Sequence, residues 1–186
     1  MNETEQYILN AIKVWVWSGF YSPDEVQDMI GDILEDAADE NKVRGAVAPE
    51  FEKKAIAEIS WPQITDCDRL DEAFSDLNDS GVIGLQNAGY TMSDGISDVS
   101  EELEYRDRSG VKGYCFYHGQ DLERAVEGGG LMLAFGDIKD TDEGKRAVGG
   151  LVAEALSKVG FEVDWNGDPE KRISVPKLDW KRRFNG

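Results

Sequence analysis

The sequence predicts an α+β fold, in which N-terminal helices precede a mixed sheet of four or five strands with packed helices. Two observations predict it. Apolar residues recur at helical spacing through the first third of the chain, and after Pro62 short β-prone runs alternate with helical stretches. We therefore expect residues 1–60 to form a helical subdomain and residues 61–186 to form an α+β sheet domain.

The first two helices of the N-terminal subdomain have clear boundaries in the sequence. The first ends at Gly19, where the helical period breaks. The second is expected to start at Pro23, because Ser22 and Glu25 have the spacing of a capping box around a proline at the first helical position.

A third helix is expected from about Pro49. It should stop before Trp61, because the residue ahead of a proline avoids helical backbone angles. Four apolar residues at helical spacing are expected to form its buried face, namely Phe51, Ala55, Ile56 and Ile59.

The sheet domain is expected to open with a short helix capped by Asp66 or Asp68. The runs that follow alternate between strand and helix patterns. Strands are expected at residues 82–86, 111–117, 131–135 and 161–165, with 172–175 as a candidate edge strand, and helices at 99–105, 122–127 and 142–158.

The helix expected at 142–158 has the clearest signals in the chain. Asp140 or Thr141 precedes it as a cap, and Gly160 stands where a left-handed residue ends a helix. In the segment 161–165 apolar and polar residues alternate, which is typical of a strand with one buried face.

The charge of the chain limits its partners. Among 186 residues, 38 are acidic and 20 are basic, which gives a formal net charge of −18. Phosphate backbones and anionic lipid repel such a chain, so we expect neither a nucleic-acid nor a membrane partner. No apolar run approaches the roughly 20 residues that cross a bilayer. The acidic start is unlike a signal peptide, and we expect a cytoplasmic protein with reduced thiols.

Common signatures of cofactor and catalytic sites are missing from the sequence. It contains no phosphate loop, no dinucleotide-binding glycine motif, no His-Glu-x-x-His and no Gly-x-Ser-x-Gly. We therefore expect no cofactor, favour a role without catalysis, and leave the question of enzymatic activity open.

The most unusual feature is a polar loop after the first expected strand, at residues 87–98. Asp98 and Glu101 have capping-box spacing for the next helix, which explains only the end of this loop. The rest is rich in hydroxyl, amide and carboxylate groups that suit ligand binding. The candidate ligand-binding residues here are Asn87, Tyr90, Thr91, Ser93 and Asp94.

A second polar segment follows the second expected strand and supplies the candidates His118, Gln120 and Asp121. If the two strands are parallel, their carboxyl ends meet at one sheet edge, where ligands commonly bind. The sequence therefore predicts one polar cleft made by both segments, on the condition of parallel pairing.

His118 is the only histidine in the chain. A structural, hydrogen-bonded role is favoured, in which Asp121 caps the following helix; ligand binding and acid–base catalysis with Asp94 or Asp121 stay open. A metal site at Cys115 and His118 is disfavoured, because residues three apart on a strand face opposite sides. We expect no metal, and we expect Cys67 and Cys115 to be small buried apolar residues.

Three segments resemble a bacterial family known only as a domain of unknown function. They carry the patterns Trp-Pro-x-x-Thr-Asp-Cys-Asp-Arg-Leu-Asp-x-Ala-Phe, Gln-Asn-Ala-Gly-Tyr-Thr-x-Ser-Asp-Gly and Tyr-His-Gly-Gln-Asp, at residues 61–74, 86–95 and 117–121. The resemblance extends from about Phe20 to Val175. It implies no activity.

The resemblance does imply that the first of these segments belongs with the two polar loops. In that case Asp66, Asp68 and Arg69 help to frame the cleft. The alternative is that Arg69 pairs with a neighbouring aspartate and Asp68 caps its helix.

These observations favour a binding or regulatory protein whose polar cleft takes a small ligand or a peptide segment. The first alternative is an acidic inhibitor or immunity-type protein, because the net charge of −18 complements a basic partner. The second is an enzyme that uses His118. The sequence leaves the ligand, the partner and the oligomeric state open.

Overall fold

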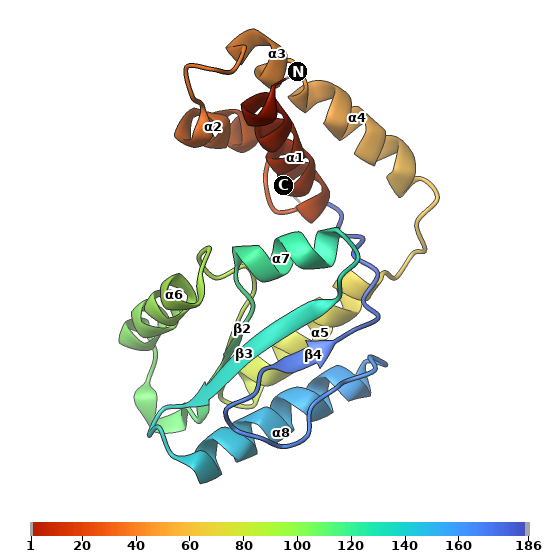
Figure 1. Cartoon of the computed structure of the whole chain (residues 1–186). Coiled ribbons are helices and arrows are strands. Elements are labelled where there is room, and N and C mark those ends of the chain that lie inside the picture. The colour runs from red at the N-terminus through yellow and green to blue at the C-terminus, as the bar shows by residue number, and fades with distance from the viewer. Residues whose placement is uncertain (1, 185–186) are drawn as a thin grey trace. The chain divides into compact units, whose positions relative to one another are not determined.

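The computed structural model describes residues 2–184, and the chain divides into two compact units. Among the described residues, the helical unit contains residues 2–65 and 180–184, and the sheet unit spans Asp66–Asp179. The fold is α+β, as predicted: helices come first, and a mixed four-stranded sheet packed with helices follows (Figure 1). No helix of residues 2–184 is both long and apolar enough to cross a membrane.

The helices of the helical unit are α1 (Glu3–Ser18), α2 (Pro23–Ile33), α3 (Glu40–Arg44) and α4 (Val47–Glu58). The predicted capping box of α2 is confirmed, with Glu25 N–H donating to Ser22 Oγ at 3.3 Å and Ser22 N–H donating to a Glu25 carboxylate oxygen at 2.7 Å. Apolar side chains of these helices form the unit's core, which contains Ile8, Ile12, Val16, Val26, Ile30, Val43 and Val47.

The predicted buried face of α4 is confirmed at Phe51, which packs against the core, and is wrong at Ala55, Ile56 and Ile59. Ile56 and Ile59 are 69% and 85% exposed, whereas Lys54 is only 3% exposed. The Lys54 ammonium pairs with Glu58 one turn along the helix and lies 5.6 Å from the ring centroid of Trp61. Lys54 is therefore buried because it has a carboxylate and an aromatic partner, whereas the helical spacing predicted that Ile56 and Ile59 would be buried.

The described end of the chain packs on the turn that follows α1. The Trp180 indole N–H donates to the Ser18 carbonyl at 3.1 Å. The Arg182 guanidinium lies 4.6 Å from the ring centroid of Phe20. These contacts make the C-terminal segment part of the helical unit.

The strands of the sheet unit are β1 (Val82–Leu85), β2 (Gly113–Phe116), β3 (Leu131–Asp137) and β4 (Ile173–Val175), in the order β1-β2-β3-β4. β1 and β2 are parallel, and the other neighbours are antiparallel. Four of the predicted strands, including the candidate edge strand, are confirmed. The strand predicted at 161–165 is wrong, because only Asp164 forms a bridge there, with Ser174.

Helices pack on both faces of the sheet. Helices α5 (Asp66–Asp79) and α8 (Asp142–Lys158) pack against each other on one face (Figure 1), where the Phe74 ring meets Tyr117. Helix α6 (Met92–Tyr105) covers the opposite face, where Val99 joins Phe116 and Ala134 in one apolar cluster. Helix α7 (Gly119–Val126) packs on β3.

Two helices of the sheet unit begin earlier than the sequence predicted. α6 begins at Met92, so Asp98 lies inside the helix and the capping box predicted for Asp98 and Glu101 is wrong. α7 begins at Gly119, which places Asp121 in its first turn and His118 at the N-cap position. The cap predicted at Asp66 or Asp68 is also wrong, because α5 begins at Asp66.

Contacts cover both edges of the sheet. At β1, the Asn78 side chain donates to the Gly84 carbonyl at 3.1 Å and accepts from the Gly84 N–H at 3.2 Å. At β4, Asp164 and Ser174 exchange backbone hydrogen bonds of 2.9 and 3.1 Å. The outer polar groups of Gly84 and Ser174 are therefore satisfied inside the chain.

Candidate functional site

The two polar segments predicted to share a sheet edge lie side by side in the structure. The parallel pairing of β1 and β2 brings their carboxyl ends together. Gly119 N–H donates to the Gly89 carbonyl at 2.9 Å, and Gln120 N–H donates to the Tyr90 carbonyl at 3.3 Å. Backbone hydrogen bonds thus join the segment after β1 to the start of α7.

Several of the candidate side chains bond to the protein itself. One carboxylate oxygen of Asp94 accepts from the Thr91 N–H and the Thr91 hydroxyl, both at 2.9 Å. Thr91 and Asp94 therefore form the capping box of α6. The Tyr90 hydroxyl donates to Glu123 at 3.3 Å.

The side chains of the other candidates, Ser93, Gln120 and Asn87, take no part in the side-chain hydrogen bonds just described. Ser93 is exposed in the first turn of α6, and Gln120 is exposed in the first turn of α7. Asn87 adopts a left-handed backbone angle of φ 53° and lines a hollow of about 260 Å³ beside α6. The acidic side chains of Asp98, Glu101 and Glu102 line the same hollow.

Because of Asp94, the stability of the sheet unit is expected to fall as the pH is lowered into the acid range. The hydrogen bonds donated by Thr91 hold the pKa of Asp94 below its ordinary value. Such a group stabilises the fold above its unfolded-state pKa, and this contribution is lost as the pH falls through the folded-state pKa. Urea midpoints measured from pH 7 down to pH 3 should therefore show Asp94→Asn as less stable at pH 7, with the difference shrinking toward pH 3.

Ser97→Ala, a change of an exposed residue that does not titrate in the same helix, serves as the control. Its curve should run parallel to that of the parent across the same pH range. If the gap between Asp94→Asn and the parent stayed constant down to pH 3, ionised Asp94 would not be the stabilising form.

A buried polar cluster of the sheet unit contains His118, Asp121 and Arg172. One carboxylate oxygen of Asp121 lies 3.2 Å from His118 Nε2 and also accepts from an Nη of Arg172. The same Arg172 nitrogen donates to the Met132 carbonyl at 3.0 Å. The side chains of His118 and Asp121 are each only 6% exposed, so this cluster connects α7 to β3 and β4 from inside the fold.

His118 is expected to be neutral at neutral pH. Burial lowers its pKa, and the nearby Arg172 charge acts in the same direction, against the opposing effect of the Asp121 and Asp94 carboxylates. We therefore assign the Nε2 proton to the bond with Asp121. The buried Nδ1 has no hydrogen-bond partner among the described residues.

Arg172 connects this cluster to a surface hollow of about 230 Å³, which we call the Arg172 hollow. It lies between the start of α6, the sheet and the segment before β4. Its lining consists of Met92, Ile96, Tyr114, Ala134, Phe135, Asp140, Lys145, Pro169, Glu170, Lys171 and Arg172. Met92 and Ile96 belong to the polar loop predicted from the sequence, and Arg172 is held by Asp121 from the second predicted segment.

The charged groups in this lining are mostly paired with one another. The Lys145 ammonium lies 3.0 Å from Asp140 and 3.2 Å from Glu170, and these bonds raise the pKa of Lys145 above its ordinary value. The Tyr114 hydroxyl makes no hydrogen bond within residues 2–184, and the same holds for one terminal nitrogen of Arg172, its Nη1. Neither of these two atoms is fully buried. Both therefore remain accessible for a ligand.

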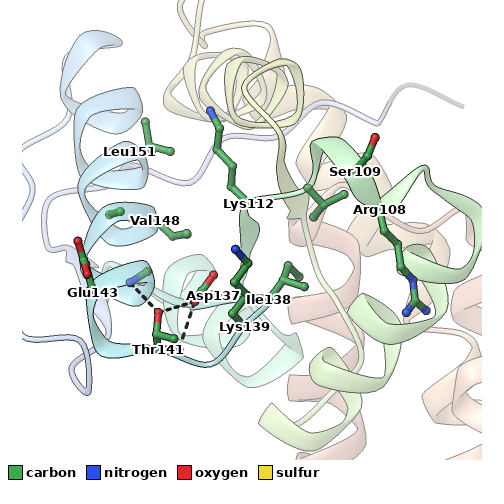
Figure 2. Close-up of a pocket in the computed structure, with 13 residues that line it drawn as sticks. Arg108, Ser109, Lys112, Asp137, Ile138, Lys139, Thr141, Glu143, Val148 and Leu151 are labelled. Carbon is green, nitrogen blue, oxygen red and sulfur yellow. Dashed lines mark hydrogen bonds between the residues drawn. The ribbon is translucent and has the colours of Figure 1, made fainter.

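A larger hollow of about 530 Å³ lies where β2 begins and β3 ends, and we call it the Lys112 hollow. Figure 2 shows Lys112 and Lys139 between helix α8 and the turn that carries Ser109. Sequence reasoning missed this hollow. The antiparallel pairing of Gly113 with Asp137 brings the two lysines to one place, and only the register of β2 and β3 reveals this.

The residues implicated by the resemblance lie elsewhere. Arg69 forms an ion pair with Asp66 at 2.5 Å, as in the alternative in which Arg69 pairs with a neighbouring aspartate. Its guanidinium lies 5.8 Å from the ring centroid of Phe161. Asp66 also accepts from the Asp179 N–H at 2.9 Å. Neither Arg69 nor Asp68 lines any of the three hollows described above.

The cysteines are buried, as predicted. Cys115 is wholly buried, and burial raises the pKa of its thiol above the ordinary value. Cys67 is 1% exposed in helix α5. Among residues 2–184, no group of three or more His, Cys, Asp or Glu side chains is placed to hold a metal ion.

Comparison with known protein families gives a match. No curated protein matches the chain, and no solved structure does. The model of one family, described as a domain of unknown function (DUF6891), matches residues 1–184, which is nearly the whole chain. The chain therefore belongs to the DUF6891 family.

Proposed function

We propose that the protein binds a small organic carboxylate in the Arg172 hollow and acts by binding. One observation carries this proposal. Arg172 lines a hollow of about 230 Å³ and is held by a buried carboxylate, while its Nη1 has no hydrogen-bond partner within the described residues. A donor that is fixed by buried partners and open on one side is the usual design of a ligand-recognition group.

The chemistry of the lining indicates the class of ligand. The Arg172 guanidinium only donates, and the Tyr114 hydroxyl donates or accepts, so a carboxylate can bond to both. Met92, Ile96 and Phe135 offer apolar surface in the same hollow. An aromatic or branched aliphatic carboxylate combines the two properties.

His118 and Asp121 act as positioning residues in this proposal. Asp121 holds the guanidinium, and His118 Nε2 lies 3.2 Å from the same carboxylate oxygen. The imidazole itself is not part of the lining of the Arg172 hollow. The burial of this histidine favours the binding role over the enzyme that would use it as an acid or base.

Thermal unfolding with benzoate, phenylacetate and isovalerate as probes tests the proposal. At a tenfold excess over its dissociation constant, a bound probe stabilises the folded state by about 1.4 kcal/mol and should raise the Tm of the parent by about 3–6 °C. Tyr114→Phe removes a hydroxyl without an internal partner, so it should leave the Tm of the unliganded protein unchanged and reduce the shift. Arg172→Lys should reduce the shift further, because lysine lacks the forked guanidinium.

Tyr105→Phe is the matched control, because Tyr105 is 87% exposed and lies outside the Arg172 hollow. It should respond to the probes as the parent does. The proposal fails if none of the three carboxylates shifts the parent, or if Tyr114→Phe and Arg172→Lys respond as strongly as the parent.

A further inference from the structure

We propose a second binding site in the Lys112 hollow, which takes an organic phosphate monoester with an apolar body. The site lies at the end of the sheet where β2 begins and β3 ends, whereas the parallel strands present their carboxyl ends at the other. It is independent of the carboxylate site proposed above. Its occupant is inferred from unpaired charge and from the apolar wall.

The unpaired charge in this hollow is positive. Arg108, Lys112 and Lys139 line it, and within residues 2–184 none of the three has a carboxylate within 4.0 Å, the limit for an ion pair. Most basic side chains of the sheet unit do have such a partner. Unpaired cations gathered in one hollow of a chain with net charge −18 favour an anionic ligand.

Carboxylates also line the Lys112 hollow, and the charge of Lys139 helps to lower the pKa of Asp137, but neither lysine forms an ion pair with a carboxylate within residues 2–184. Asp137 accepts from the Thr141 hydroxyl at 2.8 Å and from the Thr141 N–H at 3.2 Å, where it supports the start of α8. Although burial opposes it, these bonds hold the pKa of Asp137 below its ordinary value. Figure 2 shows the Glu143 side chain on the outer side of α8, away from Lys112 and Lys139.

The lysines make the principal contacts in this site. Figure 2 shows the Arg108 guanidinium turned away from both ammonium groups. Figure 2 shows the two ammonium groups at different levels of the hollow, and both lysines are exposed, so their long side chains can turn toward one ligand. A doubly charged phosphate then matches them better than a singly charged carboxylate, because it can accept a charge-assisted hydrogen bond from each. The site therefore prefers a phosphate monoester to a carboxylate of the same size.

The wall of the hollow is apolar. Val148 and Leu151 line it from α8, and Val111 and Ile138 line it from the segments that flank the strands. Ile138 is 38% exposed. An inorganic ion would leave this surface in water, whereas an aryl or alkyl group attached to the phosphate would cover it. The volume of about 530 Å³ accommodates such a molecule.

Isothermal titration of the parent with phenyl phosphate, inorganic phosphate and phenol tests this site. Phenyl phosphate should bind saturably and more tightly than either of the other two probes. The double variant Lys112→Gln/Lys139→Gln should bind phenyl phosphate at least about tenfold more weakly, because it loses two charge-assisted contacts.

The double variant Lys13→Gln/Lys53→Gln is the matched control, because it changes the net charge equally but lies in the helical unit. It should bind phenyl phosphate like the parent. The inference is wrong if phenyl phosphate does not bind, if inorganic phosphate binds as tightly, or if the two double variants behave alike. Tyr114→Phe should leave phenyl phosphate binding unchanged, so failure of the carboxylate site and failure of this site are distinguishable.

Discussion

Replacing Asp121 with alanine is expected to lower the free energy of unfolding of the sheet unit by about 3 kcal/mol. Removal of one partner of a buried ion pair costs about 3–5 kcal/mol, because the other charge stays behind without compensation. Arg172 keeps 29% of its side chain exposed and can turn part of its charge to water, which places the cost near the lower end. Asp121 also accepts from the His118 N–H at the start of α7.

Urea unfolding followed by circular dichroism measures this loss. Glu104→Ala, an exposed change on α6, is the control and should stay within about 0.5 kcal/mol of the parent. The variant Asp121→Ala/Arg172→Ala should lose less than the sum of the two single changes, because it leaves no unpaired arginine. Strict additivity would show that the ion pair is not a coupled unit.

Alanine substitution at two adjacent glycines of α8 is expected to have opposite effects. A Cβ at Gly149 would lie 2.6 Å from the Trp165 ring and 2.8 Å from the Phe135 ring. The Trp165 indole N–H is held by the carbonyls of Asp168 and Lys171, so its ring cannot readily move away. Gly149→Ala should therefore destabilise the sheet unit by about 1–3 kcal/mol.

Gly150 supplies the matched comparison, since a Cβ there meets nothing within 4 Å. Gly150→Ala should stabilise the sheet unit by about 0.5–1 kcal/mol, because alanine loses less backbone freedom than glycine when the helix forms. The same urea measurement separates the two variants. Equal effects from both would mean that α8 does not pack on Phe135 and Trp165 as closely as the structure shows.

The elements that the sequence predicted correctly are those whose signals are local. The predicted bounds of α8 agree with the structure because Thr141 caps it by bonding to the Gly144 N–H, and Gly160, at φ 95°, stands just after it. Strands β1 and β3 were likewise predictable from short apolar runs next to turns. Each of these signals depends on a few neighbouring residues.

The start of α6 could not be predicted in this way, because two capping-box patterns compete in the loop after β1. Thr91 with Asp94 and Asp98 with Glu101 have the same spacing. The structure uses the first, and the extra turns place Gly95 against the Phe116 ring, where a Cβ would lie 2.3 Å away. That contact joins a helix to a strand and is invisible to local patterns.

The candidate site was predictable in part. Polar residues after two strands predicted that the segments near Thr91 and His118 would meet, and the parallel pairing of β1 and β2 brings them together. The contact of Arg172 with Asp121 could not be predicted, because the two residues lie 51 positions apart in the sequence.

The covered edges of the sheet restrict how any other polypeptide can associate with it. Peptides are often recognised by strand addition, in which an extended segment joins the outermost strand through main-chain bonds. Here the Asn78 side chain already forms hydrogen bonds with the N–H and carbonyl of Gly84 at the β1 edge. The bridge between Asp164 and Ser174 covers the opposite edge, at β4. An extended peptide would find no unpaired main-chain groups at these positions. For the same reason, a second copy of the chain cannot add a strand to the sheet there.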